Sequence, residues 1–301
     1  MVAQKLGLAK FGEGVPEAAQ IRTQLPELSK STLYLDQTKW ARVGSAPATD
    51  TWLLGRYDVM CVRAAADYDM HWRFIKGNRP CFWVLHAAAL NIGESTTTAS
   101  DFQDFSTHKG ALLDMGAYLK AMRHIFENVL KACLDLSVEH LIAFPFGMGA
   151  FIRHLQKLDE RFKDITEMDK LREAIAHEFV TALVEREAST KFQVHFCLFL
   201  GTDEAKCNAQ AWISRLRGLG PNWRERVTLW PNADSLYLAH ELSLRFGGVG
   251  NHVALLNGAN RKRFGNHWFG KGAKMAIDEN LHRRSWRLAA TSHVINATAS
   301  R

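Results

Sequence analysis

Two adjacent acids, Asp278 and Glu279, follow an amide-bearing strand end and a glycine-bearing loop near the C-terminus of the chain. The stretch 253–284 opens with an apolar run typical of a buried strand, passes through Asn257 and Asn260, and then crosses a loop that contains three glycines. It closes on residues that predict the first turn of a helix, where the two acids stand. Amides, flexible backbone and two carboxylates are suited to holding a polar ligand. The alternative is helix capping, because the helix dipole stabilises carboxylates near an N-terminus.

A second segment with chemical potential is the loop 146–151, FGMGAF, which leaves the end of an apolar strand. Its two glycines, Gly147 and Gly149, let the backbone approach a ligand closely, and successive N–H groups in such a loop favour an anion such as a diphosphate. A pair of glycines separated by one residue is common in ordinary turns. The position at a strand end gives this pair its interest, because ligands of open α/β sheets bind beyond the carboxyl ends of the strands.

Three further side chains stand at strand or loop ends. Asp234 follows a short strand and is suited to accept a hydrogen bond from an amino group such as that of adenine; the alternative is that Asp234 or Ser235 caps the next helix. Phe199 and Phe151 are suited to stack on a base or pack on a sugar. The alternative for both phenylalanines is a place in the hydrophobic core.

Histidine and cysteine patterns favour neither metal nor thiol chemistry. His86 lies inside an apolar strand and is predicted to be a hydrogen-bonded core residue. The 13 histidines include no HExxH motif, so no metal site is predicted. The five cysteines show no CxxC spacing and are predicted to be reduced and mostly buried, which favours a cytosolic setting. Cys81 and Cys197 lie in apolar strands without an evident activating partner, so a cysteine nucleophile is disfavoured.

The elements that must position these residues alternate between strands and helices. Strands are expected at 57–64, 81–89, 140–145, 192–200, 227–230 and 253–256. Helices are expected at 111–136, 168–186, 203–216 and 235–246, and from about residue 276. Alternation of this kind predicts an α/β protein, a three-layer α/β/α sandwich with a mainly parallel or mixed sheet.

Length and composition indicate a globular protein with 47% apolar and 23% charged residues. Residues 1–50, broken by prolines and glycines, are predicted to form an arm or irregular cap, and residues 51–301 to form the folded domain. The net charge of +7 favours an anionic partner. No basic run is longer than Arg261–Arg263, and no apolar run reaches the length of a membrane span or a signal peptide.

The residues HLIAFP at 140–145, followed by FGMGAF at 146–151, resemble the macrodomain family, whose members bind ADP-ribose and often hydrolyse its linkages. In that family a late strand ending in FP leads into the phosphate loop and an aromatic residue. The helix and the strand FQVHFCLFL at 192–200 resemble the family's closing helix and final strand, and VLHA at 84–87 is similar to its VIH strand.

The order of the pieces differs from the family's. The segments similar to its beginning stand here at the C-terminal end: a strand leading to Asp234, the residues NGAN at 257–260, and the glycine loop ending in Ala-Ile at 276–277. The resemblance therefore implies a macrodomain-like mixed sheet in circularly permuted order, which is tolerable when natural termini lie close together. It covers about residues 55–290.

The resemblance also implies roles for individual residues. These are adenine recognition by Asp234 with Phe199 beside it, diphosphate binding by the N–H groups of Gly147, Met148, Gly149 and Ala150, and contact with the distal ribose by Asn260, Asn257 and Phe151. Two departures stand out. The family's run of glycines is reduced to Gly265 with Gly270 and Gly272 beyond it, and Lys274 occupies the position of the acid found in one hydrolase branch.

The pair Asp278 and Glu279 is similar to the paired glutamates of poly(ADP-ribose) glycohydrolases. It also resembles the arrangement in permuted macrodomain-like effectors of intracellular bacteria that release ADP-ribose from ubiquitin. These resemblances imply a hydrolase in which one acid, its pKa raised by burial, transfers a proton while the other orients ribose hydroxyls or stabilises a cationic transition state.

The implied partner is ADP-ribose on a protein, ubiquitin being one possibility. No cofactor and no membrane are expected, and the location would be the cytosol, or the host cytosol for a secreted effector. The alternative is a module that binds ADP-ribose without cleaving it. A third class, nucleic-acid binding, is suggested by the basic balance and nine tryptophans but is disfavoured as the charge is scattered.

Overall fold

The computed structural model describes residues 59–69, 71–93, 101–107, 112–187, 191–246, 252–258, 265, 277–289 and 292. Several predictions from the sequence lie outside the described residues. These are the arm at 1–50, Asn260, the basic run 261–263, Gly270, Gly272 and Lys274.

The described strands belong to an α/β protein with a mixed sheet, as the sequence predicts. They are β1 (Val59–Ala64), β2 (Phe82–Ala87), β5 (His140–Ala143), β6 (Gln193–Leu198), β7 (Val227–Pro231) and β8 (Val253–Gly258). Their order is β1-β2-β8-β5-β6-β7. β1 is antiparallel to β2, whereas β8 is parallel to both β2 and β5, and β7 is parallel to β6. This arrangement is compatible with a three-layer sandwich.

The helices alternate with these strands along the chain. They are α4 (Met115–Asp135), α5 (Ile165–Glu185), α6 (Asp203–Arg217), α7 (Pro221–Arg224), α8 (Ser235–Phe246) and α9 (Ile277–Arg284). Short 3-10 turns occupy 102–105 (η3), 149–151 (η5), 155–157 (η6) and 160–163 (η7), and a small two-stranded sheet joins β3 (Ser106–Thr107) to β4 (Leu112–Leu113).

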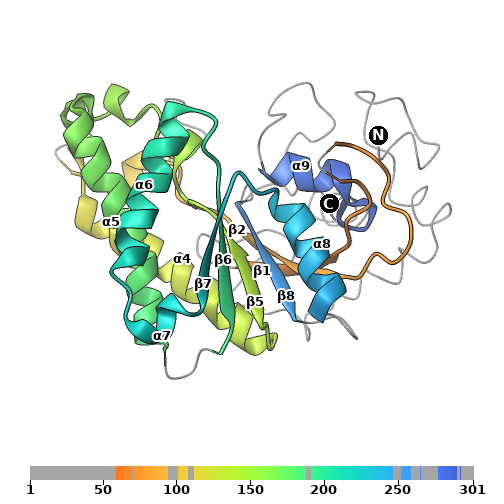
Figure 1. Ribbon diagram of the computed structural model, residues 1–301. Coiled ribbons are helices and arrows are strands. Elements are labelled where there is room, and N and C mark those ends of the chain that lie inside the picture. The colour runs from red at the N-terminus through yellow and green to blue at the C-terminus, as the bar shows by residue number, and fades with distance from the viewer. Residues whose placement is uncertain are drawn as a thin grey trace, which may run out of the picture. The chain divides into compact units, whose positions relative to one another are not determined.

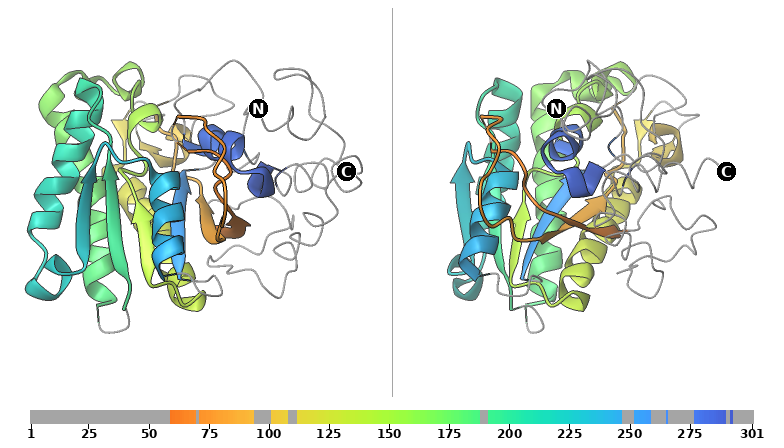
Figure 2. Two further views of the ribbon diagram at one scale, coloured as in Figure 1. Left: turned by 45° about the vertical axis from the view of Figure 1, so that its right-hand side comes forward. Right: turned by 90° about the vertical axis from the view of Figure 1, so that its right-hand side faces the viewer.

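The chain divides into two compact units. The first comprises Met1–Ala88, Ala132–Ile142 and Asp234–Arg301, and the second comprises Ala89–Lys131 and Ala143–Ala233. In the first unit every residue of β2 is buried, as are five of the six residues of β8, because both strands are almost continuously apolar. Helix α8 packs on β8 and β2, and α9 packs on β8 (Figure 1). The left view of Figure 2 also shows α8 beside β8.

An aromatic cluster fills the core of the second unit. The ring of Trp212 on α6 lies 5.1 Å from Phe179 on α5 and 4.6 Å from Phe196 on β6. Phe126 on α4 lies 5.3 Å from Phe179 at an interplanar angle of 84°. Edge-to-face contacts of this kind add to the burial of large rings, so the cluster ties three helices to one strand.

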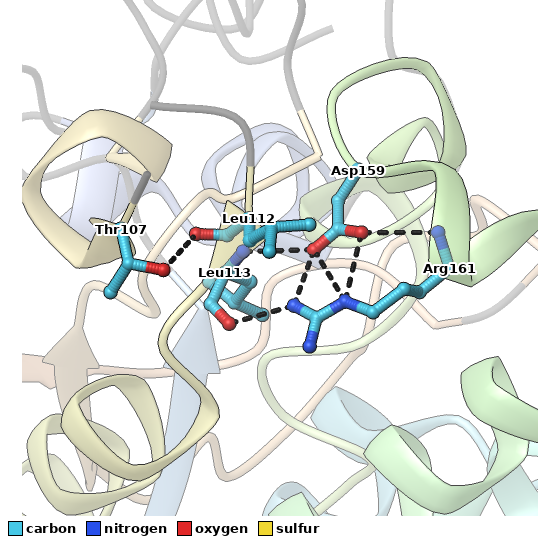
Figure 3. A network of polar contacts seen from close by, with 5 residues as sticks. All are labelled: Thr107, Leu112, Leu113, Asp159 and Arg161. Carbon is cyan, nitrogen blue, oxygen red and sulfur yellow. Dashed lines mark hydrogen bonds and ion pairs between the residues drawn. The ribbon is translucent and has the colours of Figure 1, made fainter. Parts of the chain in front are cut away.

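The predicted helix at 111–136 begins later than expected, at Met115. Leu112 and Leu113 form β4 instead, and the Leu113 N–H donates to the carboxylate of Asp159 at 2.8 Å (Figure 3). Asp159 is buried and also binds the Arg161 side chain, whose guanidinium donates to the Leu113 carbonyl at 2.8 Å. A partner 46 residues away thus overrides the helical pattern of the two leucines.

Local capping sets other boundaries. Helix α5 starts at Ile165 rather than Met168 because Asp164 accepts a hydrogen bond from the Thr166 N–H. Strand β5 ends at Ala143, two residues before Pro145, which has no N–H to continue the ladder. Helix α8 has the bounds that the sequence predicts. Among the described residues, none of the helices has the length and apolar character needed to cross a bilayer.

Candidate functional site

The end of β8 and the first turn of α9 meet through a direct hydrogen bond in the first unit. Asn257 Nδ2 donates to Asp278 Oδ1 at 2.8 Å and lies 3.0 Å from Nδ1 of His86 on β2. His86 and Asn257 stand opposite each other in the parallel register of β2 and β8, so strand pairing alone brings them together. The structure therefore joins the predicted amide to the first of the two predicted acids, and adds His86, which is fully buried and hydrogen-bonded as the sequence predicts.

These contacts fix the orientation of the amide and the tautomer of the histidine. The Asn257 NH₂ group faces the Asp278 carboxylate and a ring nitrogen of His86. Its two N–H donors are both used if the carboxylate and the ring nitrogen each accept. His86 Nδ1 is then the acceptor, and its proton sits on Nε2. Burial lowers the pKa of His86 from 6.5 to about 3; Asp278 opposes this shift and His282 adds to it. His86 is therefore neutral at physiological pH.

Asp278 has a second partner on its own helix. His282 lies one turn later, with Nδ1 at 3.1 Å from Asp278 Oδ1 and 2.7 Å from the Asp278 carbonyl oxygen. On the other side of the ring, His282 Nε2 lies 2.6 Å from Ser292 Oγ. The histidine and the serine are fully buried, so the three side chains form a chain of polar contacts closed off from solvent.

Burial alone would raise the pKa of Asp278, but the contacts and charges around it reverse that effect. His282, His86 and Asn257 together bring the pKa of Asp278 below its ordinary value of 3.8. Burial raises the pKa of Asp278 as expected, but its partners outweigh that effect and the net shift is downward. This residue is a carboxylate at neutral pH and a poor proton donor.

Two buried acceptors remain at the junction. Within the part of the chain that the structure describes, neither Asn257 Oδ1 nor Asp278 Oδ2 has a hydrogen-bond partner. Buried polar atoms are nearly always hydrogen-bonded, so each exception calls for an explanation. Unpartnered acceptors on two side chains that are hydrogen-bonded to each other are suited to a ligand that carries hydroxyl donors.

Glu279, the second predicted acid, is also buried. Arg283 lies one turn along the same helix; burial lowers the pKa of Arg283, and the charge of Glu279 opposes that change. Both acids stand in the first turn of α9, where the helix dipole stabilises them, and basic residues occupy its last turn. The helix-dipole interpretation thus agrees with their position, yet the carboxylate of Asp278 has specific partners on β8 and α9 as well.

Asp234 performs the capping role that the sequence left open. Its Oδ1 accepts from the Tyr237 N–H at 2.7 Å, in the first turn of α8. Its Oδ2 forms an ion pair at 2.5 Å with Arg284, a buried residue at the end of α9. Asp234 therefore connects the start of α8 to the end of α9, and recognition of adenine by this residue stays a prediction.

The loop 146–151 lies in the second unit and has the backbone conformation that its glycines permit. Gly147 and Gly149 have φ of +82° and +70°, which side chains disfavour. A Cβ on Gly147 would lie 2.6 Å from Cε of Met122, whereas one on Gly149 would meet nothing within 4 Å. Met148 between them is buried and Ala150 is exposed. Diphosphate binding by these four residues stays a prediction.

The two phenylalanines differ in their surroundings. Phe199, just after β6, is 53% exposed, so the alternative that it belongs to the core is wrong. Its ring lies over Gly201, where an added Cβ would come within 2.3 Å of Cζ. Phe151 is half-buried, and its carbonyl oxygen accepts from the N–H groups of Ile92 and Gly93. Contact of either ring with a ligand stays a prediction.

Cysteine burial follows the predicted trend. Cys61, Cys133 and Cys197 are buried, and Cys81 and Cys207 are half-buried. The described residues contain no group of three or more His, Cys, Asp or Glu side chains suited to a metal ion.

Sequence reasoning missed His282, Ser292 and Arg284. The spacing of Asp278 and His282 by four residues on an expected helix was a usable signal, because such pairs share a helix face. Ser292 carried no signal, since its contact depends on how the chain turns after α9.

Compared with known proteins, the chain matches no protein-family model, and no curated protein matches its sequence.

Proposed function

We propose that this protein is a hydrolase that releases ADP-ribose from an ADP-ribosylated protein, with Asp278 and Glu279 as the working acids. The observation that carries the proposal is the hydrogen-bonded junction of Asn257 and Asp278, in which each side chain keeps one buried acceptor, Asn257 Oδ1 and Asp278 Oδ2, without a partner among the described residues. Adjacent hydroxyls of a ribose supply two donors at a matching chemical position. The amide after an apolar strand and the acid at a helix start are also the pieces that resemble the macrodomain family.

The proposed fold is a macrodomain-like three-layer sandwich in permuted order. The parallel pairing of β5 with β8 supports it, since the two strands that lead into the proposed phosphate loop and the proposed ribose segment are neighbours in the sheet. Parallel neighbours end at the same edge, where open α/β sheets bind ligands. The proposal keeps the role that the resemblance implies for Asp234, which is recognition of the adenine.

The two acids take different parts in the proposed reaction. A water molecule attacks the anomeric carbon of the ribose, the bond from that carbon to the linking atom breaks, and the leaving group takes up a proton. Asp278 is ionised and its pKa is lowered, so it orients ribose hydroxyls and stabilises the positive charge that develops on the sugar. Glu279 is left to transfer the proton.

The test combines binding and release. Calorimetry with free ADP-ribose measures binding, and release of ADP-ribose from a modified protein such as ADP-ribosylated ubiquitin measures activity. We expect Glu279→Gln to bind ADP-ribose and to lose roughly a hundredfold or more in release, and Asp278→Asn to lose both. Glu160→Gln is the matched control, because the side chain of Glu160 is 88% exposed and pairs with Lys163 at the surface.

Release that continues unchanged in both acid variants would remove the acids from the mechanism. Absence of ADP-ribose binding by the wild-type protein would end the proposal altogether.

A second candidate function is that of a binding module without catalysis. The observation that favours it is the burial of both acids together with the lowered pKa of Asp278, since a residue engaged in a closed polar network serves binding as well as chemistry. This candidate predicts that the wild-type protein binds ADP-ribose and leaves the modified protein intact. The release measurement on wild-type protein therefore separates the two.

A further inference from the structure

Asp278, His282 and Ser292 form a connected series of polar contacts at and after the start of α9. His282 Nδ1 faces two oxygen atoms of Asp278, the carbonyl at 2.7 Å and the carboxylate Oδ1 at 3.1 Å. Both oxygens only accept when the acid is ionised, so Nδ1 carries the proton and donates. On the other side of the ring, Nε2 lies 2.6 Å from the hydroxyl of Ser292. The contacts therefore connect Ser292, through His282, to Asp278.

A serine, a histidine and an aspartate in this order have the connectivity of a nucleophilic triad. Burial does not separate Ser292 from Asp278, since both are buried, but the buried atom without a partner among the described residues belongs to Asp278. The same connectivity can also hold Asp278, the acid at the end of this series of contacts, in one orientation. The carboxylate of Asp278 is the member of the chain that carries a buried atom, Oδ2, without a partner among the described residues.

We propose that His282, together with Ser292, is a positioning residue that fixes the Asp278 carboxylate with Oδ1 turned toward His282 and Asn257 and Oδ2 turned toward the ligand. The inference rests on the proposed function for the identity of that ligand. Ser292 sets the ring of His282, the ring sets Oδ1, and Asn257 closes the other side of the same oxygen at 2.8 Å. Rotation of the carboxylate would break both contacts to Oδ1. The partners of Oδ1 therefore determine the direction of Oδ2.

The groups that face Asp278 come from three elements. His86 on β2 is neutral, Asn257 on β8 donates through its amide, and His282 on α9 donates through Nδ1. The other charged residues of α9 are Glu279 in the first turn and Arg283 and Arg284 in the last turn. The pKa of Asp278 is lowered chiefly by His282 once the opposing effect of burial is counted, which supports the assignment of His282 as the residue that holds the carboxylate.

The experiment uses a matched pair of substitutions at His282. Asn places an N–H at the position of Nδ1 and so keeps the donor to Asp278, whereas Gln places its amide at the position of Nε2 and loses that donor. Carbon-13 NMR of the side-chain carboxyl, assigned with Asp278→Asn, follows the titration of Asp278 directly. We expect His282→Asn to titrate near wild type, and His282→Gln to titrate roughly one pH unit or more higher. Ser292→Ala, a milder change that protects against loss of folding, is expected to shift the titration upward by less.

Equal titration of Asp278 in the wild type, His282→Gln and Ser292→Ala would overturn the inference. Labelling of Ser292 by a fluorophosphonate probe would overturn it too, because a reactive serine means a nucleophile. The acid limb of the pH profile for ADP-ribose release should move upward in His282→Gln and stay in place in His282→Asn. If the wild-type protein releases no ADP-ribose, the proposed function fails while the NMR titration still decides the role of His282.

Discussion

His86 should make the stability of the protein depend on pH in the mildly acidic range. The folded protein lowers the pKa of His86 from 6.5 to about 3, chiefly by burial, and the Asn257 amide occupies the ring nitrogen that a second proton would need. As the pH falls below 6.5 the unfolded chain takes up a proton at this residue and the folded protein does not. Because the unfolded state then binds more protons, the free energy of unfolding decreases as the pH falls.

The size of this pH effect on stability follows from the interval between the unfolded and folded pKa values of His86. Stability from His86 is fully present above pH 6.5 and is lost progressively between about pH 6.5 and pH 3. At pH 5 the loss corresponds to about 1.5 pKa units, or about 2 kcal/mol for a group that is fully buried. A loss of this size is a large fraction of the ~5–15 kcal/mol that stabilises a typical domain.

Urea unfolding at pH 7, 6 and 5, followed by tryptophan fluorescence, measures this loss. The comparison is with His86→Asn, which keeps an acceptor for the Asn257 amide and has no titrating ring. Burial also lowers the pKa values of His140 and His240, so both proteins should lose some stability in acid. The expected result is a loss between pH 7 and pH 5 that is about 2 kcal/mol larger in the wild type than in the variant. Equal losses in the two proteins would refute the reasoning, since they would mean that His86 titrates alike in the folded and unfolded states.

Two further predictions concern the second unit, and thermal or urea unfolding checks both. Gly147→Ala should destabilise the protein by about 2–3 kcal/mol, because the φ of Gly147 is positive and the new Cβ would meet Cε of Met122. Gly149→Ala has the backbone strain without the clash and should cost about 1 kcal/mol. Equal costs in the two variants would rule out the clash. Asp159→Ala should cost about 2 kcal/mol of stability, because it leaves a buried N–H of β4 without its acceptor. Glu160→Ala, at an exposed neighbouring position, should change stability by under about 0.5 kcal/mol. An Asp159→Ala variant as stable as the wild type would contradict this prediction.

The hydrophobic pattern of the sequence was sufficient to predict most of the described strands and helices. The continuous apolar runs at 81–89 and 253–256 are found as buried strands, and the 235–246 helix has its predicted bounds. These predictions succeed because burial on two faces and a single apolar stripe leave direct marks on the residue pattern. Errors occur where a distant partner decides, as at Leu112 and Leu113, whose ladder and contact with Asp159 cannot be read from local spacing.

The candidate site was predictable in its members but not in its connections. Asn257 and Asp278 were both identified from residue type and position, yet the hydrogen bond between them depends on where α9 packs on β8. Asp234 combines both cases: the helix-capping alternative is confirmed, and the ion pair with Arg284 was not predicted. Helix capping is a local interaction and was readable, whereas the ion pair spans 50 residues and was not.

The electrostatics of the first-unit site limit which part of a ligand it can receive. His86 is neutral, and Asp278 is a buried carboxylate whose Oδ1 is already held by two donors. An anionic group brought against Oδ2 would face uncompensated repulsion at low dielectric, whereas a hydroxyl donor or a sugar with developing positive charge would be stabilised. A hydroxyl-bearing group such as the proposed ribose is therefore favoured beside Asp278 over a phosphate. A diphosphate would need hydrogen-bond donors, which this carboxylate does not supply, and comparing ADP-ribose binding with binding of ribose alone measures what such donors add.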